Sequence, residues 1–245
     1  ILMCLSIWNG FFNSVQSVCK ERPILKREHR AGLHMSSYIA AHMIYQFVIC
    51  FLQTAICMLI YYVFGLKLSG SGLMTPWFAM DLFITLFLMT YAADMMSLLL
   101  SCLVHTTTTA MTLMPFLLIF QLVFSGGFLE IRGGMSGVSY LTISKWGMNA
   151  VCSVSNYNEQ PSTALTLGLM RLEKSPDLAP VIEYAKEKTD LIPKMEAYVS
   201  KYSQDPQYAY TKKNVGKDWA ILGAFALIYA LLGMIALEFI DKDKR

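Results

Sequence analysis

Charged side chains are scarce in this sequence. Asp, Glu, Lys and Arg make up 15% of the 245 residues, where about 25% is usual in a soluble domain. The formal net charge is only +3, and hydrophobic residues reach 55%, above the roughly 45–50% of an ordinary domain. These values argue against a nucleic-acid-binding protein, a disordered tail and a secreted disulfide scaffold. Either a large core or a set of membrane spans would explain them.

Familiar metal and nucleotide motifs are also absent from the sequence. The six cysteines include no C-x-x-C pair, and the four histidines include no H-E-x-x-H, the spacings that many metal sites use. No G-x-x-x-x-G-K-[ST] occurs anywhere in the chain, so the loop that cradles nucleotide phosphates is missing. We therefore expect no metal site, no bound cofactor and no enzymatic activity in this chain.

Five stretches are long and apolar enough to cross a membrane. A bilayer core of about 30 Å requires roughly 20 mostly apolar helical residues. The stretches are residues 1–19, 39–64, 76–104, 110–128 and 219–237. All but the third lack Asp, Glu, Lys and Arg, and in lipid each must be helical to satisfy its backbone. The sequence predicts an all-α, polytopic bundle in an integral membrane protein.

The basic residues predict how this bundle is oriented. Residues 20–30 hold Lys and Arg at five positions against two Glu, and further basic residues follow the last stretch. By the positive-inside rule, residues 20–38 and the C-terminal tail are expected in the cytoplasm and residues 129–218 outside, in a plasma or inner membrane. Five spans would leave the amino end outside, so we expect at least one further span before residue 1.

Polar side chains recur at helical spacing in two of the apolar stretches. Those in residues 1–19 share one helical face: Ser6, Asn9, Asn13 and Gln16. Those in residues 39–64 form a similar row: His42, Gln46, Cys50, Gln53 and Cys57. Carboxamides facing lipid would be costly, so both faces must meet protein or water. Hydrogen bonding between helices and the lining of a polar pathway both fit this pattern.

Two carboxylates lie in the third stretch, where Thr75-Pro76 predicts the start of a helix. Asp81 falls near the outer end of the stretch and is expected to reach water, whereas Asp94 lies deeper. Each fits either a proton or cation site or a structural carboxylate bonded to a neighbouring helix. The first possibility makes an ion-coupled secondary transporter that uses Asp81 and Asp94 the alternative function for this chain.

The charged residues 20–38 predict a helix at the membrane surface, which either anchors the chain or docks a cytoplasmic partner. Its order of residues, Glu21-Arg22, Arg27-Glu28, Gly32 and Ser36-Ser37-Tyr38, resembles the connecting helix of ABCG-type (white/brown-like, type-2 exporter) ABC transporters. A second set resembles the end of the fifth span and the re-entrant outer helix of that family: Phe124, Ser125, Gly126, Tyr140, Ile143, Lys145, Trp146, Gly147 and Ala150. The resemblance covers residues 1 to about 155 and the last span.

This resemblance implies the transmembrane permease domain of an ATP-driven exporter for an amphipathic or hydrophobic substrate. The family counterpart has six spans, of which residues 1–19 would be the second. An ABC ATPase domain, upstream on the same chain or separate, would bind ATP and Mg²⁺, and a second permease copy would complete a homo- or heterodimer. Residues 1–158 would form the permease core, with an outer helix at about 138–155. Residues 159–217 would form an extracellular insert or lid, and residues 218–245 the last span and tail.

The resemblance also assigns roles to individual residues. Movement of the ATPase would be received by four charged residues: Glu21, Arg22, Arg27 and Glu28. The substrate path would be lined from two spans: Asn9, Phe11, Phe12, Asn13, Thr112, Phe116 and Ile119. An outer plug would fall at Gly127 and Phe128. In the insert, Ile192, Met195, Val199 and Tyr202 recur at the spacing of an amphipathic helix.

Overall fold

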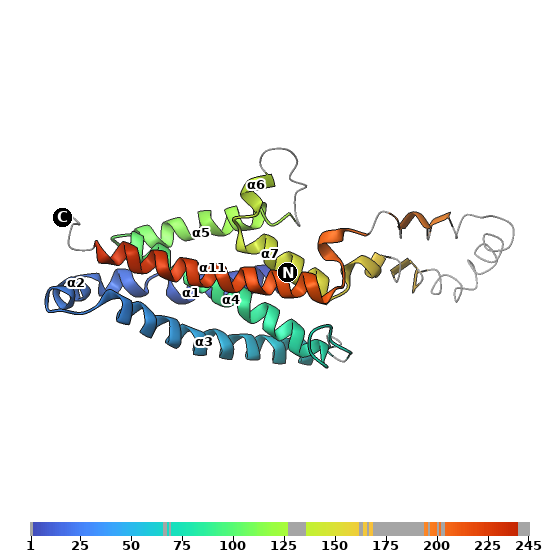
Figure 1. The fold of residues 1–245 in the computed structure, drawn as a ribbon, viewed down its shortest axis with the longest axis horizontal. Coiled ribbons are helices and arrows are strands. Elements are labelled where there is room, and N and C mark those ends of the chain that lie inside the picture. Colours follow the sequence, from blue (N-terminus) through green and yellow to red (C-terminus); the bar gives the residue numbers. More distant parts are fainter. Residues whose placement is uncertain are drawn as a thin grey trace.

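The computed structural model describes residues 2–65, 68, 70–126, 136–161, 164, 165, 167, 168, 194, 195, 197–199, 201 and 204–239. These residues are almost entirely helical, and the one β pairing among them is an isolated bridge between Ser71 and Trp77. Figure 1 shows an elongated bundle in which the long helices run side by side. The chain is a polytopic helical membrane protein, as its sequence predicts.

Each of the five apolar stretches contains a helix. Three helices are long and apolar enough to cross a membrane: α3 (Met35–Val63), α4 (Phe78–Leu103) and α11 (Lys212–Glu238). The first and fourth stretches give shorter helices, α1 (Leu2–Ser14) and α5 (Thr107–Val123). Because α1 ends at Ser14 and α5 at Val123, both end earlier than the apolar composition predicts.

Helix α4 is the centre of the bundle. In its most apolar 18-residue window 67% of residues are buried, compared with 22% in α3 and 28% in α11. Helices α1, α3 and α11 all pack against it. Consequently α3 and α11 keep much of their apolar surface for the surrounding lipid, while α4 makes the protein core.

The contact between α1 and α4 is a contact between backbones. A Cβ atom added at Gly10 would lie 2.2 Å from the carbonyl oxygen of Thr90 and 2.9 Å from Cβ of Ala93. Small residues permit such close packing of helices in membranes, where dispersion contacts replace the hydrophobic effect. Gly10 is therefore the residue that sets the distance between α1 and α4.

The charged segment is not one helix over residues 20–38. Helix α2 (Ser17–Arg30) is followed by the C-cap residue Ala31, and α3 starts at Met35. Gly32 lies between them with a φ of +104°, a left-handed conformation that favours glycine and ends helices. Tyr38 consequently belongs to α3, on the other side of a turn from α2.

Thr75 and Pro76 do not begin α4, which starts at Phe78 after the N-cap residue Trp77. The side chain of Asp81 explains the later start, because it accepts hydrogen bonds from the backbone N–H groups of Leu73, Met74 and Thr75 at 2.5–2.9 Å. The carboxylate thereby folds the preceding loop back over the first turn of the helix.

After α5 in the sequence come the helices α6 (Ser136–Ser139) and α7 (Ile143–Val154). The predicted outer helix at about 138–155 is therefore divided, and α7 is its main part. Helix α7 packs against α4 and α11, and the short 3-10 helices η2 (Tyr157–Glu159) and η3 (Pro206–Tyr208) lie close to it. The predicted plug at Gly127 and Phe128, the tail, and most of the insert lie outside the described residues.

Replacing Gly10 with alanine should destabilise the bundle, because the new methyl group meets the backbone of Thr90. Overpacking of this kind costs about 1–3 kcal/mol, so the thermal melting temperature in detergent should fall. Gly223→Ala in α11 is the matched control, since a Cβ there has nothing within 4 Å. Equal melting temperatures for the two variants would contradict the backbone contact.

Candidate functional site

The charged helix α2 is fastened to the C-terminal end of α4. The backbone N–H groups of Val18 and Cys19 both donate to Oγ of Ser101, each at 3.1 Å. Nη1 of Arg22 donates to the carbonyl oxygens of Cys102 and Val104, at 2.9 and 3.0 Å. Carbonyls at the end of a helix have no partner within the helix, and a cation there also suits the helix dipole. These four hydrogen bonds tie α2 to the end of α4.

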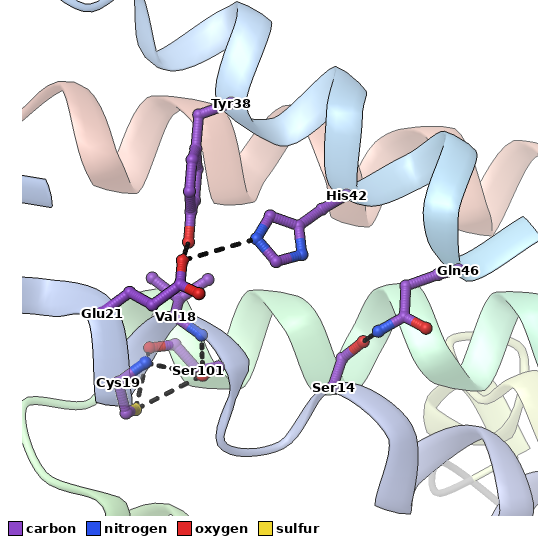
Figure 2. Close-up of polar contacts among 8 residues, drawn as sticks. All are labelled: Ser14, Val18, Cys19, Glu21, Tyr38, His42, Gln46 and Ser101. Atoms are coloured by element: carbon purple, nitrogen blue, oxygen red, sulfur yellow. Dashed lines mark hydrogen bonds and ion pairs between the residues drawn. The ribbon is translucent and has the colours of Figure 1, made fainter. Parts of the chain in front are cut away.

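Helix α2 also contacts the start of α3 through Glu21 (Figure 2). The Tyr38 hydroxyl donates to Oε2 of Glu21 at 2.7 Å, and Nε2 of His42 lies 4.0 Å from the same oxygen. The rings of Tyr38 and His42 meet edge to face, with their centroids 4.7 Å apart. One carboxylate thus joins the charged helix to a membrane-spanning helix.

The four charged residues assigned to coupling do not share one environment. Glu21, Arg27 and Glu28 are exposed, as a surface for a partner requires. Arg22 is only 8% exposed and is held by the end of α4. Arg22 thus makes an internal contact, because its guanidinium satisfies carbonyls at the end of α4.

The two polar faces meet each other across α1 and α3. Asn13 and Gln53 exchange two amide hydrogen bonds, both at 2.8 Å. Nδ2 of Asn9 lies 3.6 Å from Sγ of Cys57. These contacts show hydrogen bonding between the two helices at these four residues.

Asp94 extends this network to α4. It is fully buried and accepts from Oγ of Ser14 at 2.5 Å and from Sγ of Cys50 at 3.5 Å. Nε2 of Gln46 in turn donates to the Ser14 hydroxyl at 2.6 Å (Figure 2). Asp94 thus serves as a structural carboxylate bonded to neighbouring helices.

The expectation that Asp81 reaches water is wrong. Asp81 is 0% exposed, because the loop before α4 covers it while donating three backbone hydrogen bonds. Thirteen residues separate it from Asp94, which corresponds to about 20 Å along a helix. The two carboxylates therefore do not form a common ion site.

A cavity of about 590 Å³ lies where α1, α2, α3 and α5 converge, within the roughly 300–1,000 Å³ of small-molecule sites. It combines aromatic, amide and oppositely charged side chains. It is lined by Phe12, Asn13, Val15, Gln16, Ser17, Lys20, Glu21, His42, Tyr45 and Met111. Such a lining can hold a molecule with both an apolar body and polar groups.

Only part of the expected substrate path reaches this cavity. Phe12 and Asn13 line it, but Phe11 is 0% exposed in the protein core. Phe11 therefore lies on the buried side of α1 and Phe12 on the open side, so the structure places only Phe12 at the cavity. Asn9 is half-buried against Cys57.

The predicted path residues of α5 are exposed on that helix: Thr112, Phe116 and Ile119. None of them lines the cavity, which α5 reaches through Met111 instead. Sequence reasoning also missed Tyr45, although its spacing of three from His42 places it on the same side of α3. Among the described residues, no three His, Cys, Asp or Glu side chains gather as metal ligands.

Replacing Arg22 with glutamine should loosen the junction between α2 and α4. Losing charged hydrogen bonds and leaving buried carbonyls unpaired costs about 1.5–3 kcal/mol, so the melting temperature should fall. Amide hydrogen exchange in residues 17–30 should also become faster. Arg27→Gln is the matched control, since Arg27 is exposed and surface changes usually stay within about 0.5 kcal/mol. Equal exchange in both variants would contradict the anchoring role of Arg22.

Comparison with known proteins agrees with this architecture. Residues 1–155, more than half of the chain, match the family described as ABC-2 type transporter. A protein of Mycobacterium tuberculosis named ABC transporter ATP-binding/permease protein Rv1747 is 28% identical over 149 residues, which are 59% of this chain and 17% of that protein. The chain therefore belongs to the ABC-2 type transporter family and is a membrane permease of an ABC transporter.

Proposed function

We propose that this chain is the permease part of an ATP-driven exporter for amphipathic or hydrophobic molecules. The observation that carries the proposal is the junction of α2: its charged side is exposed, its buried side holds the end of α4, and the 590 Å³ cavity lies beside it. A force applied to α2 would therefore reach both the helix core and the cavity.

The ATPase that applies this force is an ABC domain, upstream on the same chain or separate, and it binds ATP and Mg²⁺. The printed name of the Mycobacterium tuberculosis relative joins ATP-binding and permease, which supports such a pairing. This chain contributes no catalytic residue and no cofactor site to hydrolysis. Its role is to receive movement, with α2 and the C-terminal tail in the cytoplasm and residues 129–218 outside.

Two routes lead from α2 into the bundle. Through Arg22 and Ser101, α2 moves the end of α4. Through Glu21, it moves Tyr38 and the first turns of α3. Helix α1 continues into α2 through a turn at Val15 and Gln16. Both residues line the larger cavity, so the shape of this cavity changes when α2 moves.

A second permease copy, identical or related, would complete the transport path. Helices α1 and α5 both carry exposed apolar side chains that a second copy could cover: Leu5, Trp8, Phe12, Phe116, Ile119 and Phe120. Because Phe12 also lines the cavity, a partner on this surface would close the cavity from one side. The ion-coupled alternative has less support, since Asp81 and Asp94 are buried and their carboxylates already accept hydrogen bonds from the protein.

Reversing the exposed charges of α2 should uncouple ATP hydrolysis from transport. We expect Glu21→Lys and Arg27→Glu in the complete transporter to lower transport of fluorescent amphipathic dyes about tenfold, while basal ATP hydrolysis in proteoliposomes persists. Lys213→Glu, an exposed charge at the opposite end of the bundle, should leave coupling intact. Normal coupling in both α2 variants would refute the transmission role.

Alanine substitutions at the neighbouring residues Phe11 and Phe12 should have different effects, the first on stability and the second on transport. Phe11→Ala removes a fully buried ring and should cost about 3–5 kcal/mol, lowering the melting temperature. Phe12→Ala changes an exposed ring at the cavity and should leave the melting temperature nearly unchanged. Dye transport by the Phe12 variant should nevertheless fall several-fold. Unchanged transport in this variant would remove Phe12 from the substrate path.

A further inference from the structure

Helix α7 and the start of α11 lie at the other end of the bundle from α2 (Figure 1). A second, smaller cavity lies between these two helices and η3. Its volume is about 220 Å³, below the roughly 300–1,000 Å³ of sites for drug-sized molecules. Its lining is mainly polar and aromatic: Tyr140, Lys145, Trp146, Asn149, Pro206, Gln207, Asn214, Lys217 and Asp218. None of these residues lines the larger cavity.

Asp218 is the unusual member of this lining. It is 3% exposed, and its Oδ2 atom is buried without a hydrogen-bond partner among the described residues. Buried carboxylate oxygens are nearly always paired, because an unpaired one loses its hydration without compensation. A carboxylate that borders the cavity therefore has one oxygen without a donor in the described part of the chain.

Two lysines bring positive charge to the same cavity. Nζ of Lys145 lies 3.4 Å from the centroid of the Tyr140 ring and 3.2 Å from Oγ of Ser139. Nζ of Lys217 lies 5.2 Å from the centroid of the Trp146 ring. Aromatic faces hold ammonium groups in place, and an ammonium has three N–H donors, so both lysines can still pair with an anion.

The charges restrict which ligand fits. A simple cation would be repelled by Lys145 and Lys217, and a simple anion by the Asp218 carboxylate. A small group that carries both signs of charge satisfies all three residues. Its cationic end must also donate a hydrogen bond, because the Asp218 carboxylate at the cavity is an acceptor.

We propose that this cavity binds a phosphoethanolamine group. The phosphate pairs with Lys145 and Lys217, and the primary ammonium donates to the Asp218 carboxylate. Phosphate is favoured as the anion because the cavity lies at the end of a membrane-spanning helix beside Trp146 and Tyr140. Such aromatic residues mark the level of the lipid headgroups, where lysine side chains reach the lipid phosphates. The group can come from a phosphatidylethanolamine lipid or from a soluble compound.

Native mass spectrometry of the purified full-length transporter can test this site directly. The probes are phosphatidylethanolamine, phosphatidylcholine, which has no N–H donor, and phosphatidylglycerol, which has no cation. The native protein should bind phosphatidylethanolamine most tightly. Asp218→Asn and Lys145→Gln should each weaken that binding about tenfold, the effect of one charge-assisted hydrogen bond. Glu238→Gln and Lys213→Gln, at exposed positions of α11, are the matched controls and should bind like the native protein.

Equal binding of phosphatidylethanolamine and phosphatidylcholine by the native protein would overturn the proposal. So would an Asp218→Asn variant that keeps the native preference, as expected if only water occupies the site. Should Asp218→Asn fail to fold, Lys145→Gln on α7 carries the same test. Competition by millimolar soluble phosphoethanolamine would show that the headgroup suffices, and its absence would assign the site to the lipid. This measurement needs neither nucleotide nor transported cargo, so its result is separate from that of the exporter proposal.

Discussion

The packing of polar groups around α4 holds this bundle together. In a membrane interior a polar atom without a partner is expensive, and α4 supplies partners for three neighbouring segments. Its Asp94 accepts from α1 and α3, its Ser101 accepts from α2, and its last carbonyls accept from Arg22. At the opposite end, Asp81 organises the loop that precedes the helix. The most buried of the three long helices is thus also the one that orients its neighbours.

This arrangement gives α2 two distinct sides. One side is fixed to α4 by Arg22 and the contacts of Ser101, and the other presents Arg27 and Glu28 to the surroundings. A helix tied to the core on one side and charged on the other suits the transfer of force better than simple anchoring at the membrane surface. Because Glu21 contacts Tyr38 and also lines the larger cavity, coupling and substrate binding would share a residue.

The sequence predicts the number and positions of the apolar helices well, because long uncharged stretches have few other stable forms in lipid. The two polar rows are also visible from spacing alone. What spacing does not reveal is which neighbour each side chain meets. Phe11 and Phe12 are adjacent and chemically identical, yet only the packing of α1 on α4 buries one and leaves the other open. In the sequence, Arg22 cannot be distinguished from its charged neighbours, because its contact with the end of α4 depends on the tertiary structure. The burial of Asp81 likewise depends on the loop that covers it.

The close approach at Gly10 limits how the bundle can rearrange. Sliding α1 along α4 by one turn, about 5.4 Å, would bring Ser6 or Ser14 to the place of Gly10, where no Cβ fits beside Thr90. A slide of a full turn between these two helices is thereby opposed, which favours movement of the pair as one unit. Switching between two states would then have to occur by hinge rotation, with the pivot in the short connections that flank this pair.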